Sequence, residues 1–488
     1  MKRNLKSLLS IVLVIVMVFS IAGCGSKDGS SEPTNNNDDF FGIDENILAG
    51  DGDSTVDSDS ASNQGGSQGG SQGGSTTSNS DNKTGGKSWK EVLASMPESL
   101  RGTTLVIYNW NPMSEYQGAT SVIDKFQKQT GITVKWQVIN FNDYQTTVSA
   151  AVASDKAPDI LRTRTCNPIP LKNFQPLSAS GYDFTDAAWD QQTLSDYTYN
   201  GKAYAANLQN THMGTINIIM YNSALIDQYD LEDPYQLWKS GKWTWNKFIE
   251  ISKKYKKMAK TDWAIAAFQD EQFYNIFGLT GTVAKKNGKF VNISTTGEFV
   301  SVAQKIADLR YSDEIYTTTS EGINAFNNGK CLFFTDSSIF ARTKNAFFAS
   351  LKTSGSLAAV PFPTIEGQNE YFVGSGEYEA YGIAKGSKNP KAVPYFLRYF
   401  QDPQNYDLSN YYANSNILEV YNWSMKQKRI GSVGFTATID TAETDSDNGF
   451  YMKLENTKSS QIKSLLESFS NVVDSRVNNL NKAIDSLK

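Results

Sequence analysis

Polar and aromatic side chains that could hold a solute follow two apolar segments of the chain. Trp110 and Asn111 come at or just after the end of the run TLVIYNW, and Arg162 and Arg164 follow the run APDIL. A tryptophan face can lie against the C–H face of a sugar, and a guanidinium fork can grip a hydroxyl or a carboxylate. We predict that these four residues bind a ligand. A tryptophan of the core or rim would give the same pattern.

A second set of candidates lies further along the chain. Asp270 has Phe273 close by, and Asp336 and Ser337 follow the apolar run CLFF. A carboxylate that accepts two adjacent hydroxyls beside an aromatic face is a common way to hold a pyranose. We predict that these four residues contact the ligand. An acid at a helix start beside core aromatics is the alternative for the first pair.

Composition excludes several function classes. The formal net charge is -5, which argues against nucleic acid as a partner. There is a single histidine, and no cluster of Cys or His has metal-ligand spacing, so neither a metal nor another cofactor is predicted. No catalytic signature is recognisable, so we do not expect an enzyme. The 59 aromatic residues (24 Tyr, 26 Phe and 9 Trp) could fill the core and also line a carbohydrate site.

The N-terminal residues read as an export signal. Lys2, Arg3 and Lys6 precede an apolar stretch at 8–21 that is short for a membrane span. The tetrapeptide IAGC ending at Cys24 resembles the bacterial lipobox, in which the signal is cut before the cysteine and the thiol is acylated. We therefore predict a signal peptide at 1–23 and a lipid anchor at Cys24. This places the protein on the extracellular face of the bacterial cytoplasmic membrane.

A tether follows the predicted anchor. Residues 24–88 are rich in Gly, Ser, Asn and Asp and include three consecutive QGGS repeats. Such a composition buries too little apolar area to offset the entropy of ordering, so this segment is predicted to be disordered.

The remaining chain has the periodicity of an α/β protein. Strands are expected at 104–110, 132–139 and 157–161, with helices at 121–131 and 148–154 between them. This order predicts a parallel sheet, in which ligands bind at the carboxyl ends of the strands. A chain of 488 residues exceeds one usual core, so two lobes are expected. Further helices are predicted at 299–310 and 394–400, with a closing helix pair from about residue 458.

The order of short motifs resembles the extracellular solute-binding proteins that feed ABC importers, of the sugar-binding, maltose-binding-protein-like class. The matching segments are TLVIYNW, KFQKQTGITV, KAPDIL, FQPLS, YNGKAYAAN, INIIMYNSALI, WTWNKF, AFNNGKCLFF, AAVPFPTIEG and AYGIAKGSKNPKAVPYFLRYF. Each motif alone is weak, but their order and spacing make coincidence improbable.

The resemblance implies a periplasmic-binding-protein-like fold, with two doubly wound α/β lobes joined by a hinge with three crossings. The crossings are expected near 213–220, 359–364 and 408. Lobe I is then 101–212 with 365–408, and lobe II is 221–358 with 409–488. A bridge between Cys166 and Cys331 would lock such a hinge, so both thiols are predicted to be free.

The resemblance also implies a function. A sugar or oligosaccharide is expected to bind between the lobes of a monomer, close the hinge and pass to the permease subunits of an ABC transporter. Two alternatives stay open from the residues alone. One is a secreted carbohydrate-active enzyme, and the other is the same fold holding an anionic solute on Arg162 or Arg164.

Overall fold

The computed structural model describes residues 86–116, 118–163, 166–209, 211–268, 270–375, 379–408, 410–431 and 453–487. They belong to one compact unit, Ser80–Lys488. The predicted signal peptide, Cys24 and almost all of the tether lie outside the described residues, as does Arg164. Within the described part, no helix has the length and apolarity needed to cross a bilayer.

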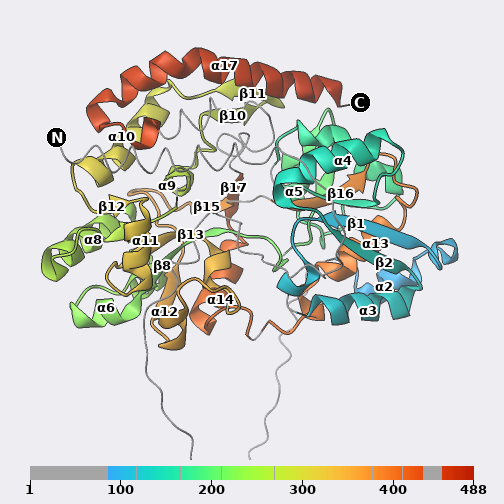
Figure 1. Ribbon diagram of the computed structural model, residues 1–488, viewed down its shortest axis with the longest axis horizontal. Coiled ribbons are helices and arrows are strands. Elements are labelled where there is room, and N and C mark those ends of the chain that lie inside the picture. The colour runs from blue at the N-terminus through green and yellow to red at the C-terminus, as the bar shows by residue number, and fades with distance from the viewer. Residues whose placement is uncertain are drawn as a thin grey trace, which may run out of the picture. The chain divides into compact units, whose positions relative to one another are not determined.

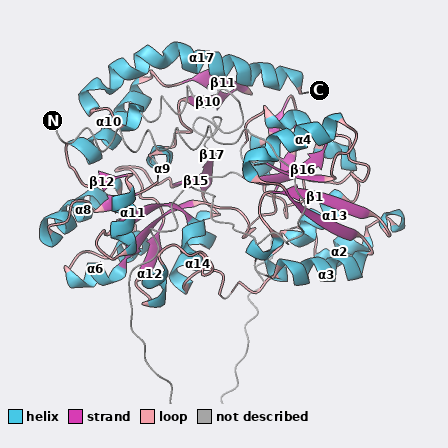
Figure 2. Cartoon of the chain, in the orientation of Figure 1, coloured by secondary structure: helices cyan, strands magenta, loops and turns pink. Residues whose placement is uncertain are grey.

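The first sheet has the strand order β2-β1-β3-β16-β4, and β7 also pairs with β16 (Figures 1 and 2). Its strands β1, β2 and β3 are parallel, as predicted. The later strand β16 instead pairs antiparallel with β3. The strands are β1 (Thr104–Asn109), β2 (Thr133–Val138), β3 (Ile160–Thr163), β4 (Phe174–Gln175), β7 (Ala205–Ala206) and β16 (Ala380–Ala384).

The helices that link and cover this sheet begin and end where local chemistry stops them. Helix α3 ends at Gly131, whose φ of 71° is a left-handed C-cap that glycine adopts without strain. Helix α5 begins at Asp190, whose side chain accepts a hydrogen bond from Thr193 N. The helices are α2 (Trp89–Ala94), α3 (Ala119–Thr130), α4 (Tyr144–Ala153), α5 (Gln191–Asp196) and α13 (Val393–Phe400).

The second sheet has the order β12-β9-β13-β8-β14, with β8 antiparallel to both of its neighbours. Its strands are β8 (Asn217–Asn222), β9 (Ile265–Ala266), β12 (Tyr316–Thr317), β13 (Phe333–Ser337) and β14 (Leu357–Val360). Its helices are α6 (Ser223–Gln228), α7 (Pro234–Lys239), α8 (Trp245–Ala259), α9 (Glu271–Ile276), α10 (Gly297–Tyr311), α11 (Ser320–Asn327), α12 (Ala349–Thr353) and α14 (Ser415–Ser424). The predicted helices at 299–310 and 394–400 are confirmed as α10 and α13.

Three small strand pairs complete the fold. They are β5 (Thr198–Tyr199) with β6 (Lys202–Ala203), β10 (Val283–Lys286) with β11 (Lys289–Asn292), and β15 (Phe372–Ser375) with β17 (Lys428–Gly431).

The C-terminal part of the chain differs from the sequence prediction. A closing helix pair was expected, and the structure instead has a single helix, α17 (Ile462–Ser486), along β10–β11 (Figure 1). The segment contains no glycine or proline that would end the helix. Ile462 and Leu466 pack in the cluster of the second sheet, and Leu480 packs with residues of the first. One uninterrupted helix therefore packs with residues of both sheets.

The passages between the two sheets can be located from packing. Residues Met213 and Ile216 belong to different hydrophobic clusters, and Leu408 packs against both. After the expected middle passage at 359–364, Thr364 bridges to Thr244 and Val373 packs in the cluster of the second sheet, whereas β16 pairs with β3 of the first sheet. The lobe boundaries stay a prediction.

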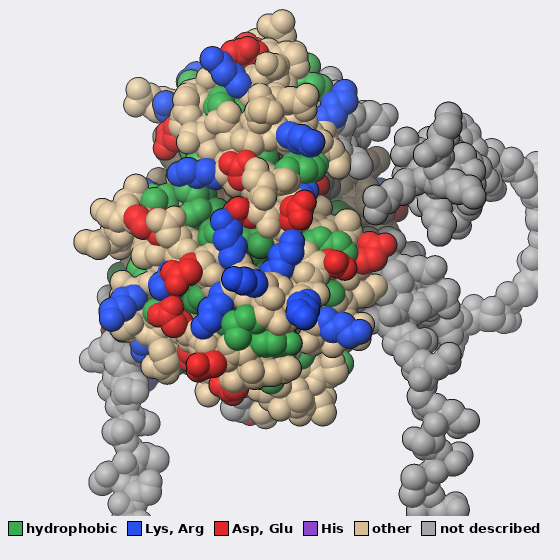
Figure 3. Space-filling view, turned by 90° about the vertical axis from the view of Figure 1, so that its left-hand side faces the viewer, with side chains coloured by type: hydrophobic (Ala, Val, Ile, Leu, Met, Phe, Trp, Pro, Cys, Tyr) green, Lys and Arg blue, Asp and Glu red, His purple; other side chains and the backbone are tan. Residues whose placement is uncertain are grey.

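The two cysteines of the described residues are buried in the core, and the surface carries charges of both signs. Cys166 and Cys331 are both free and buried, in different clusters. On the face of the molecule shown in Figure 3, basic and acidic side chains are interspersed. On α8, for example, Lys247 Nζ lies 2.8 Å from the Glu250 carboxylate.

We expect Gly382→Ala to destabilise the protein. Gly382 lies in β16, and an added Cβ would lie 2.3 Å from the backbone oxygen of Tyr204 and 2.6 Å from the ring of Phe174. Overpacking of this kind lowers the free energy of unfolding by about 1–3 kcal/mol, measurable by urea denaturation. The matched control is Gly297→Ala, where nothing lies within 4 Å of the added carbon. Equal stability of the two variants would contradict the prediction.

Candidate functional site

Polar groups gather at the carboxyl edge of the first sheet. Strand β1 ends at Asn109, and Arg162 in β3 pairs with Tyr381 in β16, so the start of β16 meets the ends of β1 and β3. Glu379 directly precedes β16. The edge predicted from strand order therefore does bring Trp110, Asn111 and Arg162 together, because parallel strands end on the same side.

The guanidinium group of Arg162 is held on several sides. Its NH1 donates to Asn109 Oδ1 at 2.8 Å and to Asn111 Oδ1 at 2.9 Å, and its NH2 forms an ion pair with Glu379. The two charged side chains are 5% and 4% exposed. Burial alone would lower the pKa of Arg162, but the Glu379 carboxylate raises it well above its usual value. Arg162 therefore stays charged, and its charge is compensated within the protein.

Trp110 is covered in this structure. Its side chain is 8% exposed, and the guanidinium carbon of Arg162 lies 4.1 Å from the ring centroid. The rings of Phe141 and Tyr144 meet it edge-on, with centroids 5.8 and 4.9 Å away. One face of the expected stacking platform is thus occupied by Arg162. The assignment of Trp110 and Arg162 to ligand binding stays a prediction.

Asn111 is half-buried and links this edge to an acid. Its backbone N donates to Asn109 Oδ1 at 2.9 Å, and its side-chain amide donates to the Glu115 carboxylate. Burial raises the pKa of Glu115, while the amide of Asn111 and the charges of Arg162 and Arg342 oppose that rise. Its assignment to ligand binding likewise stays a prediction.

Three further polar side chains, none of them among the predicted ligand-binding residues, form what we call the hinge cluster: His212, Arg342 and Tyr411. The position of His212 just before the first expected crossing made a role near the hinge conceivable, although an ordinary polar residue was the expectation. His212 and Tyr411 lie on the first and third passages between the sheets, and Arg342 follows a 3-10 turn after β13. The guanidinium carbon of Arg342 lies 5.0 Å from the ring centroid of Tyr411, and the rings of His212 and Tyr411 lie 5.3 Å apart. The only signal for Arg342 in the sequence was its place after the strand that also carries Asp336 and Ser337.

The hinge cluster carries buried polar atoms that have no hydrogen-bond partner in the described part of the chain. They are Nδ1 and Nε2 of His212, Nε and NH2 of Arg342, and the hydroxyl of Tyr411. Burial, together with the charge of Arg342, lowers the pKa of His212 to about 3, so the imidazole is neutral. The positive charge of Arg342 also opposes the rise in the pKa of Glu115 that burial causes. The cluster is therefore electrostatically coupled to the edge of the first sheet.

The candidates from the second sheet are engaged with protein groups. The Asp270 carboxylate accepts from Arg310 NH2 at 2.8 Å, from Arg310 NH1 at 3.2 Å and from the Tyr316 hydroxyl at 2.7 Å. Phe273 is fully buried, and its ring lies 4.9 Å from that of Tyr316 and 6.0 Å from that of Trp245. The structure places Phe273 in the core, and Asp270 beside an arginine that neutralises it.

Asp336 and Ser337 end strand β13. Asp336 Oδ2 accepts from Gln272 Nε2 at 3.3 Å, and Asp336 Oδ1 accepts from the backbone N of Ser337 at 2.6 Å. The Ser337 hydroxyl accepts from Ile339 N at 3.3 Å, so it caps the following turn. Their ligand roles stay predictions.

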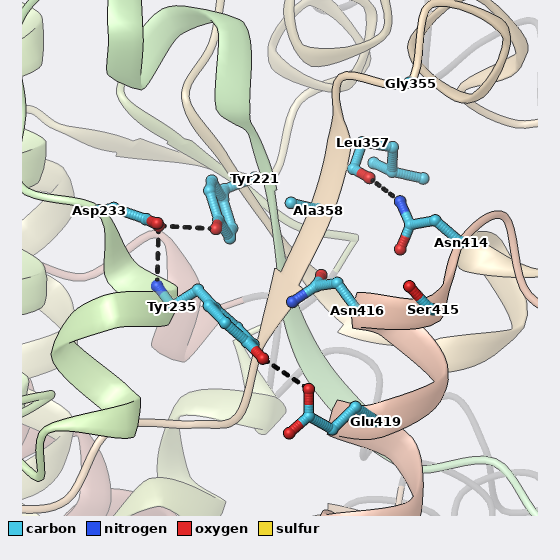
Figure 4. A pocket seen from close by; sticks show the side chains of 10 residues that line it. All are labelled: Tyr221, Asp233, Tyr235, Gly355, Leu357, Ala358, Asn414, Ser415, Asn416 and Glu419. Atoms are coloured by element: carbon cyan, nitrogen blue, oxygen red, sulfur yellow. Dashed lines mark hydrogen bonds between the residues drawn. The ribbon is translucent and has the colours of Figure 1, made fainter.

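A hollow at the other edge of the second sheet is a weaker candidate (Figure 4). Several of its polar groups are already paired. The Tyr235 hydroxyl donates to Glu419 at 2.5 Å, the Tyr221 hydroxyl donates to Asp233 at 2.8 Å, and Asn414 Nδ2 donates to Leu357 O at 2.7 Å. The hinge cluster offers more unsatisfied groups, so the candidate site is the edge of the first sheet together with the hinge cluster.

Comparison with known proteins establishes the class. The family model of the bacterial extracellular solute-binding proteins matches residues 109–407, which include Asn109, Arg162, Arg342 and Glu379. The chain belongs to this family. No curated protein sequence matches it.

Solved structures with the same fold include three that are named for the sugar they bind. The galacto-N-biose/lacto-N-biose I-binding protein of an ABC transporter from Bifidobacterium longum, in complex with lacto-N-biose, is 16% identical with a TM-score of 0.58, over 77% of this chain and 98% of that one. A maltose-bound MalE3 of T. maritima is 15% identical with a TM-score of 0.54, over 76% and 100%. A chitin oligosaccharide binding protein is 15% identical with a TM-score of 0.53, over 77% and 99%. The fold is that of the two-lobed periplasmic binding proteins, as predicted.

Replacing Glu379 by glutamine should destabilise the fold. The variant leaves Arg162 buried without its counter-charge, which costs about 3–5 kcal/mol in the free energy of unfolding. Glu419→Gln is the matched control, since Glu419 and its partner Lys239 are 43% and 47% exposed. That control should lose less than about 1 kcal/mol. Similar losses in urea unfolding of both variants would disprove the importance of the buried pair.

A second acid near Asp270 makes stability depend on pH. Glu455 accepts from the backbone N of Asp270 at 3.3 Å. Burial, and then the charge of Asp270, raises the pKa of Glu455 to about 7. Below this value the folded protein keeps a proton that the unfolded chain loses at its ordinary, lower pKa. Between these two values stability from this group therefore falls as pH rises.

Glu455→Gln should remove this slope. The variant is expected to be more stable than the unchanged protein by about 1–3 kcal/mol at pH 8, with the difference vanishing near pH 5. Neutral His212 contributes the opposite slope below its usual pKa, so the difference between the two proteins is the informative quantity. Urea unfolding at both pH values measures it. A difference independent of pH would refute the assignment.

Proposed function

We propose that this protein is a membrane-tethered receptor that binds a sugar or oligosaccharide between its lobes and delivers it to an ABC importer. The observation that carries the proposal is the family match over residues 109–407. It is supported by the polar groups at the carboxyl edge of the first sheet, where ligands bind in open α/β sheets. Three proteins of the same fold are named for disaccharides or oligosaccharides.

Binding would work by hinge closure. We propose that lobe I is 101–212 with 365–408 and that lobe II is 221–358 with 409–488. Arg162 and Asn111 belong to the first lobe, whereas Arg342 belongs to the second. A solute that contacts both groups offsets the cost of closing, and the closed form is then selected by the transporter.

Contacts away from the site would also change as the hinge moves. Lys285 in β10 donates to Thr198 O at 3.0 Å and lies 4.1 Å from the Tyr199 ring centroid. Asn200 Nδ2 donates to the backbone O of Ile484 in α17 at 2.7 Å. These contacts join the β10–β11 and α17 layer to the β5–β6 hairpin. Opening therefore involves breaking them or moving that layer together with the first lobe.

The location rests on the N-terminal residues. Acylation of Cys24 with more than one chain would anchor the protein stably, because each buried methylene contributes about 0.8 kcal/mol. The segment 24–88 would let the folded unit move above the membrane. The family consists of binding proteins, so we propose that the solute leaves unmodified and that the protein is not an enzyme.

A panel of sugars tests the proposal. The purified protein is incubated with maltose, lacto-N-biose, chitin oligosaccharides and their acidic counterparts, and both melting temperature and sugar integrity are measured. At least one sugar should raise the melting temperature and be recovered intact. Asn111→Ala should weaken its binding about tenfold, as expected for losing a buried hydrogen bond. Ser415→Ala, in the hollow of Figure 4, is the control and should bind normally.

Two results would contradict the proposal. Chromatography that finds cleavage products would favour a carbohydrate-active enzyme. A panel in which no sugar of either charge shifts the melting temperature would remove carbohydrate as the solute class.

A further inference from the structure

Buried arginines in the described residues are usually compensated by a carboxylate. In four of them the guanidinium-bearing side chain is at most 14% exposed and forms an ion pair. A buried charge without a partner is costly, so such pairing is the physical expectation. The four pairs are Arg162 with Glu379, Arg310 with Asp270, Arg398 with Asp402, and Arg429 with Asp190.

Arg342 is half-buried and forms no ion pair with a carboxylate among the described residues; the neutral side chain of Tyr412 lies within hydrogen-bonding reach of it. Its Nε and NH2 atoms are buried, and neither has a hydrogen-bond partner among the described residues. Burial alone would lower the pKa of Arg342, but Tyr411 and Tyr412 together with nearby groups raise it, so the guanidinium group stays charged. The ring of Tyr411, whose centroid lies 5.0 Å from the guanidinium carbon, offers an aromatic face but no acceptor oxygen in position.

The two carboxylates that interact electrostatically with Arg342 are engaged with other side chains. Glu379 is paired with Arg162, and Glu115 accepts from the side chain of Asn111. The Glu379 carboxylate still raises the pKa of Arg342, and the charge of Arg342 opposes the rise in the pKa of Glu115. The acceptor that Arg342 lacks is therefore not supplied from the edge of the first sheet.

Two uncharged groups beside Arg342 are unsatisfied as well. The Tyr411 hydroxyl and both ring nitrogens of His212 are buried without partners in the described chain, and the residues are 3% and 2% exposed. Buried polar groups are nearly always satisfied by protein, water or ligand. A molecule seated here would need an anionic acceptor for Arg342, and hydroxyls that can exchange hydrogen bonds with Tyr411 and His212. A sugar that bears an acidic group has both.

We propose that the solute of this receptor is an acidic sugar whose carboxylate or phosphate is bound by Arg342, with Tyr411 and His212 holding its hydroxyls. This inference rests on the proposed function and names the class of its solute. Arg162, whose charge Glu379 already compensates, then shapes the site and holds Asn111 in place without binding the anion. The forked guanidinium group of Arg342 suits either acidic group, because both present two oxygens in a plane.

Isothermal titration calorimetry with matched sugars tests this directly. Glucose is compared with glucuronate and glucose 6-phosphate, galactose with galacturonate and galactose 6-phosphate, and α-1,4-galactobiose with digalacturonate. For at least one set the acidic sugar should bind about tenfold or more tightly than its neutral counterpart, and its affinity should fall with added salt. The carboxylate and phosphate members separate the two possible acidic groups.

Variants assign the effect to Arg342. Arg342→Gln should weaken binding of the acidic sugar about tenfold or more and that of the neutral sugar less than about threefold. Arg342→Lys keeps the charge and should retain part of the preference for acid. Lys344→Gln removes an exposed charge two residues away and should change neither affinity. The melting temperature of each variant without sugar reports whether it has folded.

The acidic-sugar proposal and the receptor proposal would be contradicted by different results. If neutral sugars bind as tightly as acidic ones, or if Arg342→Gln weakens both equally while Arg342→Lys does not keep the preference, the acidic solute is wrong and the carbohydrate receptor stands. If no sugar of either kind binds, both proposals are overturned.

Discussion

The charge of Arg162 has to be compensated where no bulk water reaches it, and this requirement organises the edge of the first sheet. Glu379 supplies the counter-charge from the start of β16, and Asn109 and Asn111 supply acceptors from the end of β1. One guanidinium group thus links three chain segments and covers the face of Trp110. A buried ion pair of this kind contributes little to the net free energy of folding, because the cost of desolvating the two charges offsets much of their attraction. What it secures is the position of the side chains around it.

The two arginines of the site differ in how their charges are compensated. Arg162 forms an ion pair with Glu379, whereas Arg342 forms none among the described residues and lies in a cluster of unsatisfied polar atoms. A solute-binding protein needs both kinds of group. Ion-paired side chains keep the site in position before the solute binds, and polar groups without a protein partner can form hydrogen bonds with the solute. Under the proposed function, a solute bound to the unsatisfied groups on the passages between the sheets would couple occupancy of the site to hinge position.

Around the second sheet, the same residue types stabilise the fold instead of forming a site. Asp270 with Arg310 and Tyr316 forms a closed set of hydrogen bonds, and Phe273 packs behind it in the core. An acid beside an aromatic ring is compatible with a sugar site or with a buried ion pair. Burial and the presence of Arg310 decide between them, and residue 310 is remote from residue 270 in the sequence.

The sequence by itself determined the local elements, because hydrophobic periodicity and capping glycines act over a few residues. It gave the strands at 104–110 and 132–139, the helices near 121–131 and 299–310, and the edge at which Asn111 and Arg162 meet. The family motifs added the two-lobed fold. Only the tertiary structure decided that β16 enters the first sheet antiparallel with Glu379 at its start, that α17 is one helix in contact with both bodies, and that His212, Arg342 and Tyr411 form one cluster. The physical reason is that compensation of charge and satisfaction of buried polar atoms depend on neighbours in space, which local spacing does not encode.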